Sequence, residues 1–527
     1  MTVDGADTDA VTLDRLVLAD SYKDSVRLLE ATRAMLDVDG VSWATAVMAT
    51  PANVAVLGDE GFEPIEAKAN DLVLAARGEG PAVAAALERG KDSLFTAVAD
   101  TGSGPDSAEP VTDLRQAVAA APGANLAIVS VPGPYAALEA HKAMTAGLDV
   151  LLFSDNVSLD AEIELKRRAR SLGRLVMGPG AGTAMLGGAG LAFANRVSRG
   201  PVGIVAAAGT GAQEAMSLLD RWGIGVSHVI GLGGRDLSEA VGGLMATSAI
   251  EALDADDGTE AILVVSKPPT PAVAEALLGP PRSKPIVASM IGLREPVVVD
   301  RGVVVCNTLE QGVVETMGRL GSEPPDTIGD LDGRLATVVA SLFPTRRRLV
   351  GLFSGGTLCY EAMTIASRHV GPIHSNTPLE AGWALPEPDG AHVCLDLGEE
   401  EYTEGRPHPM IDPEARISFL RAQVTDPTVA VVIIDVVIGD GAHPDPAGLL
   451  APVAADIVKS GAAVVAYVLG TERDPQGFER QRRVLTEAGC LVTETAARAA
   501  LAAAAVVTRD PALVLEDLAV ELVASTR

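Results

Sequence analysis

Two short segments of this chain combine a glycine–threonine turn with a glutamate one helical turn later. The first is Gly209-Thr210-Gly211-Ala212-Gln213-Glu214, and the second is Gly356-Thr357-Leu358-Cys359-Tyr360-Glu361. Each follows a short apolar run and opens a predicted helix. The first N–H groups of a helix have no partner within it, and the helix dipole adds positive charge there, so such an end can hold phosphate. The duplication predicts one anion held from two sides.

The turn residues of both copies are the predicted phosphate-binding groups. Glycine permits the tight turn, and a threonine hydroxyl can cap the helix and bond an anion. The set is Gly209, Thr210, Gly211, Gly356, Thr357 and Leu358. Glu214 and Glu361 lie one turn further along the same helix face, and we predict that they orient or deprotonate a group beside the anion. The alternative is an ordinary helix start with a favourable acidic residue in its first turn.

Two arginines and a histidine complete the predicted site. Arg235 stands in a glycine-rich turn and Arg406 in a proline-rich turn, and each is expected to bind a substrate carboxylate through paired hydrogen bonds. The alternative for both is an arginine that braces a loop or lies on the surface. His408, between two prolines, is the predicted general acid or base, with Asp412 to orient it. A loop histidine bonded to the backbone is its alternative.

Other reactive side chains give weaker signals. The remaining histidines lack ligand spacing, so no metal centre is predicted. Asp396 with Glu399–Glu401 leaves a magnesium site open but favours a solvated acidic loop. Cys359 is expected to pack as a small apolar residue rather than act as a nucleophile. Lys267 follows a predicted strand end near the site, and the sequence assigns it no role.

The charge balance excludes some classes of partner. The chain has 41 Lys and Arg against 70 Asp and Glu, a net charge of −29, which argues against nucleic acid and anionic membranes but not against small anions. An aromatic content of 3% argues against stacking platforms. The acidic N-terminus, the short apolar runs and four cysteines without a CxxC motif predict a soluble, reduced, cytoplasmic protein.

The order of predicted elements indicates an α/β protein in four parts. A small α+β domain occupies residues 1–100, and a linker rich in Gly, Pro and Ser follows it. Strict alternation of strand and helix then predicts doubly wound parallel sheets. We expect a Rossmann-like domain of the CoA-binding type at 110–198 and two flavodoxin-like domains at 199–325 and 346–527. Each of the last two begins with a glycine–threonine turn.

These motifs resemble the succinyl-CoA synthetase superfamily. Residues 354–362 resemble the phosphate-side helix of its α subunit, residues 125–182 its CoA-binding domain, and residues 349–508 the ligase domain of its β subunit. The whole layout is most similar to the FdrA branch. The motifs that carry this likeness are Tyr22-Lys23-Asp24-Ser25, Thr50-Pro51-Ala52-Asn53, Ala192-Phe193-Ala194-Asn195-Arg196, Gly233-Gly234-Arg235-Asp236-Leu237 and Gly405-Arg406-Pro407-His408-Pro409-Met410-Ile411-Asp412-Pro413.

Two departures from the ligase pattern stand out. The ligases pass phosphate through a histidine, but the corresponding segment 284–293 contains none. An ATP-grasp domain is not visible either. The FdrA resemblance instead implies a carbamoyltransferase of ureide breakdown, in which oxalurate and phosphate give oxamate and carbamoyl phosphate.

The resemblance also sets the expected ligands and partners. It implies a small anionic substrate, partner subunits or a homo-oligomer, and no certain cofactor, with no nucleic acid and no membrane. Two alternatives remain open. One is an acyl-CoA synthetase component that binds CoA in the 110–198 domain and borrows a nucleotide domain from a partner. The other is a non-catalytic scaffold subunit.

Overall fold

A computed structural model describes residues 11–21, 23, 25–50, 53–54, 57–58, 60–62, 65–68, 70–95, 111–403, 407–518 and 525–526. The chain divides into two compact units. The first is Met1–Pro110 with Glu400–Pro407, and the second is Val111–Glu399 with His408–Arg527. Among the described residues, no helix has the length and apolar character needed to cross a membrane.

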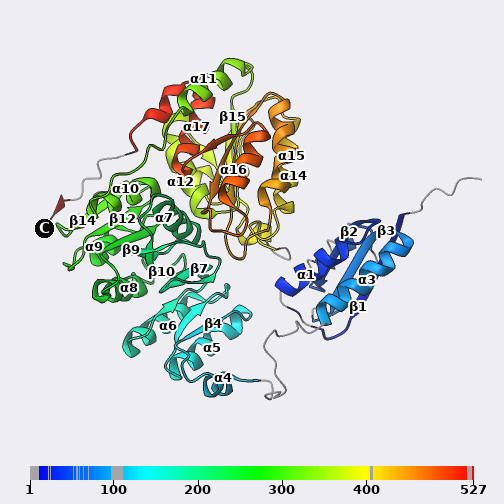
Figure 1. The fold of residues 1–527 in the computed structure, drawn as a ribbon, viewed down its shortest axis with the longest axis horizontal. Coiled ribbons are helices and arrows are strands. Elements are labelled where there is room, and N and C mark those ends of the chain that lie inside the picture. The colour runs from blue at the N-terminus through cyan, green and yellow to red at the C-terminus, as the bar shows by residue number, and fades with distance from the viewer. Residues whose placement is uncertain are drawn as a thin grey trace, which may run out of the picture. The chain divides into compact units, whose positions relative to one another are not determined.

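The first unit is a small antiparallel sheet with helices on one face. Its strands run in the order β1-β3-β2, and helices α1 and α3 share one core with the sheet (Figure 1). Leu72 and Leu74 of β3 face this core, while Val73 and Ala75 face a smaller cluster on the other side, as the alternation of a strand requires. The elements are β1 (Val11–Leu18), α1 (Ser25–Leu36), β2 (Val41–Met48), β3 (Leu72–Glu79), α3 (Gly80–Phe95) and α13 (Glu400–Thr403).

The second unit starts with three parallel strands in the order β4-β5-β6. Helix α6 (Leu159–Leu172) begins and ends at residues whose types favour a helix start and a helix end. Ser158 caps it by accepting a hydrogen bond from Ala161 N, and Gly173 ends it in the left-handed conformation. The other elements are α4 (Leu114–Ala120), β4 (Leu126–Val129), α5 (Gly133–Thr145), β5 (Asp149–Leu152) and β6 (Val176–Met177).

A seven-stranded sheet follows, in the order β14-β12-β11-β9-β10-β7-β8. The five strands from β14 to β10 are parallel and have the flavodoxin-like order, with β9 as first strand. The β7–β8 hairpin joins β10 antiparallel, so this sheet begins earlier than residue 199. Its elements are β7 (Thr183–Leu186), β8 (Ala189–Ala192), β9 (Arg199–Ala206), α7 (Gly209–Arg221), β10 (Val226–Gly231), α8 (Leu244–Ala255), β11 (Ala261–Ser266), α9 (Pro271–Leu278), β12 (Ile286–Met290), β14 (Val303–Cys306) and α10 (Leu309–Arg319).

A six-stranded parallel sheet repeats this plan, in the order β16-β17-β15-β18-β19-β20. Its elements are α11 (Leu331–Ser341), β15 (Arg348–Phe353), α12 (Gly356–Val370), β16 (Ile373–His374), the 3₁₀ helix η1 (Ala381–Trp383), β17 (His392–Asp396), α14 (Glu414–Val424), β18 (Val429–Val437), α15 (Pro446–Lys459), β19 (Ala463–Leu469), α16 (Phe478–Glu487), β20 (Leu491–Thr493), α17 (Ala496–Thr508) and the 3₁₀ helix η2 (Pro511–Leu515). Two further short strands, β13 (Val298–Val299) and β21 (Ser525–Thr526), pair with each other. The predicted α/β class with parallel sheets and a small α+β domain is confirmed.

The two larger sheets pack through the helices between them (Figure 1). Helices α7 and α10 on one sheet share a continuous core with α12 and α17 on the other. Strands β9 and β15 each stand where the strand order reverses, and each leads directly into a glycine–threonine turn. Ligands of such sheets bind at these reversal points, so the topology brings both turns to positions suited to a site.

Candidate active site

The two glycine–threonine turns touch each other. Thr357 N, at the start of α12, donates a hydrogen bond to Thr210 Oγ1, at the start of α7, over 3.3 Å. A Cβ on Gly211 would lie 2.9 Å from Thr357 Cγ2, and one on Gly355 would lie 2.8 Å from Thr210 Cγ2. Both distances are too short for a real side chain, so glycine at these two positions allows the helix ends to meet.

The meeting point borders a cavity of about 310 Å³. Four of the predicted phosphate-binding residues line it: Gly209, Thr210, Gly356 and Thr357. Gly211 and Leu358 are not among the lining residues, and Leu358 is buried in the core between the sheets. The loop 180–183 of the preceding domain forms another wall. The predicted convergence of two helix ends is therefore present, and their binding of an anion remains a prediction.

The second turn is already occupied by carboxylates of the chain itself. Asp435, at the end of β18, accepts hydrogen bonds from the N–H groups of Ser354 and Gly355, each over 2.8 Å. Arg416 Nη2 lies 3.0 Å from Asp435 Oδ1, and both side chains are buried. Two of the backbone N–H groups that precede α12 therefore already bond the Asp435 carboxylate and are not available to a ligand.

Asp396 covers the same turn from another side. It is only 2% exposed and lines the cavity, so the expected solvated acidic loop is wrong for this residue. Its carboxylate lies against Gly356, where any Cβ would collide with Asp396 Oδ2. Burial, and then the nearby Glu399, raises the pKa of Asp396 to about 7. Near neutral pH the side chain therefore exchanges a proton readily.

The first turn remains open to the cavity. Within the described part of the chain, the N–H groups of residues 208–211 make no hydrogen bond, although Ala207 N donates to Val265 O. Val265 stands where Asp435 stands in the second copy, so this half has no internal carboxylate. Of the two turns, the end of α7 is the better anion site.

Lys267 supplies the positive charge of this cavity. It follows β11, and it is the one lysine or arginine among the described lining residues. Its Nζ lies 5.3 Å from the centroid of the Tyr360 ring, and its charge acts on the Asp396 carboxyl group of the same cavity. A half-buried ammonium group in the cavity that the open N–H groups border favours an anionic ligand.

His408 also lines the cavity, and its neighbours fix its proton. Met410 N donates to Nδ1 over 3.2 Å, so the neutral ring carries its proton on Nε2. Burial, and then the charge of Arg416, lowers the pKa of His408 to about 4. At neutral pH the ring is an uncharged hydrogen-bond donor, and its role as general acid or base stays a prediction. Asp412 N donates to the backbone of His408 over 3.0 Å.

Glu214 and Glu361 are not among the lining residues of the cavity. Each instead bonds the first N–H group of a helix that belongs to the other large sheet, which is α10 for Glu361 and α17 for Glu214. Leu309 N donates to Glu361 Oε1 over 2.6 Å, while Glu214 accepts from Tyr467 Oη over 2.5 Å and, more weakly, from Ala496 N over 3.5 Å. Each carboxyl group thus connects the helices of one large sheet to those of the other, and neither lies beside the predicted anion.

Burial of these carboxyl groups predicts a pH-dependent stability. Burial raises the pKa of Glu361 to about 8, from a usual value of 4.5. Between these values the unfolded chain gives up the proton and the folded chain keeps it, so the free energy of unfolding falls as pH rises. Glutamine cannot ionise. Thermal unfolding should therefore show the Glu361→Gln variant gaining stability over the original chain between about pH 5 and about pH 8.5, by up to several kcal/mol.

Glu414→Gln is the matched control, because Glu414 is exposed on the surface helix α14. Its melting temperature should follow that of the unchanged chain at each pH. A Glu361→Gln variant that also keeps a constant difference across this range would show that Glu361 is ionised in the folded chain.

The predicted arginine sites have different outcomes. Arg235 does not line the cavity, so its predicted contact with substrate is not supported. Its Nε lies 2.8 Å from Glu162 Oε2 and its Nη2 donates to Val157 O over 2.7 Å, which ties the second domain to the third. Arg406 lies outside the described residues.

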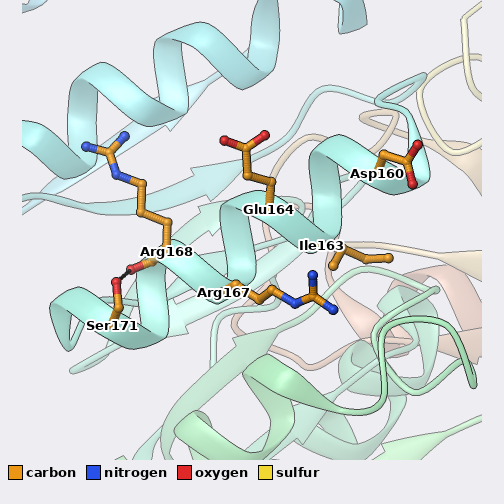
Figure 2. Close-up of a pocket in the computed structure, with 6 residues that line it drawn as sticks. All are labelled: Asp160, Ile163, Glu164, Arg167, Arg168 and Ser171. Atoms are coloured by element: carbon orange, nitrogen blue, oxygen red, sulfur yellow. Dashed lines mark hydrogen bonds between the residues drawn. The ribbon is translucent and has the colours of Figure 1, made fainter.

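A second hollow lies on the outer face of α6. Figure 2 shows that all of its labelled side chains come from this one helix, with Glu164 and Arg168 on one side of it and Arg167 on the other. Ser171 Oγ donates to the backbone oxygen of Arg168 within the helix. The charged groups of Glu164 and Arg168 are already paired with His141 and Thr145 of α5, so the cavity between the turns, which is lined by several elements, is the better candidate site.

Comparison with known proteins gives two family matches. Residues 352–506 match the CoA-ligase family, and residues 11–110 match a family described as AllF, heavy metal-associated domain. The protein YahF of Escherichia coli K12, itself uncharacterized, is 37% identical over 93% of this chain and 97% of its own length.

More distant relatives match this chain over only part of their own length or of this chain. The ADP-forming succinate–CoA ligase subunit alpha of Methanothermobacter thermautotrophicus is 27% identical over 27% of this chain and 48% of its own length. Among solved structures, the dinucleotide-forming acetyl-coenzyme A synthetase 1 of Ca. Korarchaeum cryptofilum is 18% identical over 75% of this chain and 85% of that chain, with a TM-score of 0.26.

The CoA-ligase match suggests CoA-related binding, which the loops of the second domain test. The loops after β4, β5 and β6 (130–134, 153–157 and 178–182) contain no lysine or arginine. At the start of α5, a Cβ on Gly133 would lie 2.5 Å from Asp155 O, so a carbonyl oxygen covers this helix end. Phosphate groups need donors at such a position. These loops therefore offer the phosphates of CoA no positively charged side chain.

The match of residues 11–110 to a heavy metal-associated domain family suggests heavy-metal binding. The side chains that could act as ligands allow this suggestion to be tested. Soft metal ions select thiolate and imidazole ligands. Residues 11–110 contain no cysteine and no histidine. The described residues of the chain hold no group of three His, Cys, Asp or Glu side chains suited to a metal ion. The side chains of this domain do not fit a heavy-metal site.

Proposed function

Because the chain belongs to the CoA-ligase (succinyl-CoA synthetase) superfamily and carries an AllF-type N-terminal domain, we propose that it transfers a carbamoyl group to and from phosphate. The observation that carries this proposal is the cavity where two helix ends meet, with the end of α7 and Lys267 available to hold an anion. The name AllF and the FdrA-like motifs point to ureide breakdown as the setting.

The proposed reaction balances without a nucleotide. Oxalurate and hydrogen phosphate give oxamate and carbamoyl phosphate. A phosphate oxygen forms a bond to the carbamoyl carbon, and the bond from that carbon to the oxamate nitrogen breaks. The proton of hydrogen phosphate ends on the oxamate nitrogen. No oxidant, metal ion or ATP takes part, which agrees with the absence of a histidine in segment 284–293.

The cavity residues can supply the charge and the protons of this reaction. Phosphate would lie at the N–H groups of residues 208–211, beside the Thr210 hydroxyl and the Lys267 ammonium group. His408 would donate a hydrogen bond from Nε2 to the oxygen that gains negative charge as the carbamoyl carbon is attacked. Asp396, with its pKa of about 7, would pass the proton to the leaving nitrogen.

Partner subunits form part of the proposal. The succinate–CoA ligase relative is named as a subunit, and no ATP-grasp domain is visible in the sequence of this chain. The lack of lysine and arginine in the loops after β4, β5 and β6 makes an acyl-CoA synthetase role less suitable than carbamoyl transfer. A scaffold without chemistry would not need a half-buried lysine in a cavity that open N–H groups border.

The direct test runs the reaction backwards with the full chain and its partner subunits. Oxamate and carbamoyl phosphate should yield inorganic phosphate and oxalurate, followed by a phosphate assay and by chromatography. Carbamoyl phosphate without oxamate measures spontaneous hydrolysis. Succinate with CoA and ATP serves as the comparison for ligase chemistry. Phosphate release that does not depend on oxamate, or turnover only with CoA, would reject carbamoyl transfer.

A further inference from the structure

One buried polar atom beside the cavity has no partner. Gln213, the fifth residue of α7, lines the cavity and is only 2% exposed. Its Oε1 makes no hydrogen bond to any described residue. Leaving a buried acceptor unpaired is unfavourable, so a ligand that supplies a donor would remove this penalty.

The neighbours of Gln213 determine which end of its amide is free. Asn195 Nδ2 donates to Asp474 Oδ2 over 2.8 Å and to Ile438 O over 2.7 Å, and neither of those oxygens can donate. Asn195 Oδ1 must therefore be the atom that faces Gln213, and Gln213 Nε2 donates to it over 3.3 Å. The network fixes the amide with Oε1 as the unpaired atom.

The ligand chemistry follows from the position of this acceptor. Gln213 lies about one helical turn beyond the open N–H groups and lines the same cavity. An anion bound at the end of α7 would therefore hold the rest of the ligand molecule near Gln213. In the second copy the corresponding residue is Tyr360, which lies over Lys267 and offers no amide oxygen. Only the first copy therefore combines an open helix end with a buried, unpaired acceptor.

We propose that Gln213 Oε1 accepts a hydrogen bond from the amide N–H of a carbamoyl group bound through its phosphate at the end of α7. Gln213 thereby selects carbamoyl phosphate over acetyl phosphate, which has a methyl group where the carbamoyl group has its NH₂. This inference rests on the proposed function and names the residue that sets its substrate class. A site built to bond an N–H group rejects an analogue that lacks it, because the acceptor is then left unpaired.

The test compares two ligands in the full chain. Binding of carbamoyl phosphate, acetyl phosphate and inorganic phosphate is measured by calorimetry in the original chain and in Gln213→Met, which keeps the length of the side chain. We expect the original chain to bind carbamoyl phosphate about tenfold or more tightly than acetyl phosphate, and the variant to lose this preference. Binding of inorganic phosphate should be unchanged. Gln213→Asn, which withdraws the oxygen by one methylene, replaces the methionine variant if that protein does not fold.

Gln423→Met, on the surface helix α14, is the matched control and should keep the full preference. If no phosphate compound binds to the original chain, the anion site and the inference both fail. If carbamoyl phosphate and acetyl phosphate bind equally well to the original chain, the inference fails while the anion site stands. A preference that persists in Gln213→Met and Gln213→Asn would overturn the role of Gln213 alone.

Discussion

Replacement of Lys267 by methionine should lower kcat/KM for carbamoyl transfer by roughly 10²–10³-fold, the usual effect of removing one group that stabilises developing negative charge. Lys267 is the one lysine or arginine among the described residues that line the cavity. Methionine keeps an apolar stem that can pack on the Tyr360 ring, so the change removes charge more than packing. The measurement is the oxamate-dependent release of phosphate from carbamoyl phosphate.

A second readout separates binding from folding. Phosphate should raise the melting temperature of the original chain, and this shift should largely disappear in Lys267→Met. Lys142→Met is the matched control, because Lys142 lies exposed on α5 and pairs with Glu139. If Lys267→Met keeps both the shift and the rate, the anion is not held at this lysine, and the cavity has been assigned the wrong ligand.

Arg416→Met should destabilise the protein by about 3–5 kcal/mol, because it leaves Asp435 as a buried charge without its cation. Arg416 is 2% exposed and Asp435 is 1% exposed. Arg416 also donates to Leu352 O over 2.6 Å and to Asp435 O over 2.9 Å, so its loss removes these two hydrogen bonds as well. Urea unfolding followed by circular dichroism measures the effect.

Two further variants test this explanation. Arg421→Met changes an exposed arginine on the same helix and should shift the unfolding midpoint little. Arg416→Met combined with Asp435→Asn removes the stranded charge and should recover part of the lost stability. If Arg416→Met alone unfolds at the same urea concentration as the original chain, then the pair does not hold the second turn in place.

The sequence predicts the strands and helices of this protein well because their signals are local. The predicted α/β class with its small α+β domain is present, and the Ser158 and Gly173 caps at the two ends of α6 are local signals of this kind. The β7–β8 hairpin was missed as part of the third domain, since its antiparallel pairing with β10 depends on residues distant in sequence. Periodicity within a segment carries no information about such a partner.

The site shows a similar limit. The duplicated turns identify the place of the cavity, but they suggest more symmetry than the structure has. The sequence offers one sign of this, because Asp435 interrupts the apolar run Val429–Val437. Its partner Arg416 lies on another helix, and no pattern links the two. The sequence also could not predict where the side chains of Glu214 and Glu361 point. Their backbone hydrogen-bond donors come from α17 and α10, and only the packing of those helices brings the donors near.

The crossed contacts of Glu214 and Glu361 have a consequence for motion. If the seven-stranded sheet and its helices shifted relative to the six-stranded sheet and its helices, α10 and α17 would both lose the carboxyl groups that bond their first N–H groups. We therefore expect the two parts to move as one rigid block. The loop 180–182, which forms another wall of the cavity, is also held in place, because Gly180 N donates to Ser154 O over 3.0 Å and Phe193 N donates to Gly182 O over 2.9 Å. We therefore expect a preformed cavity whose geometry changes little when an anion binds.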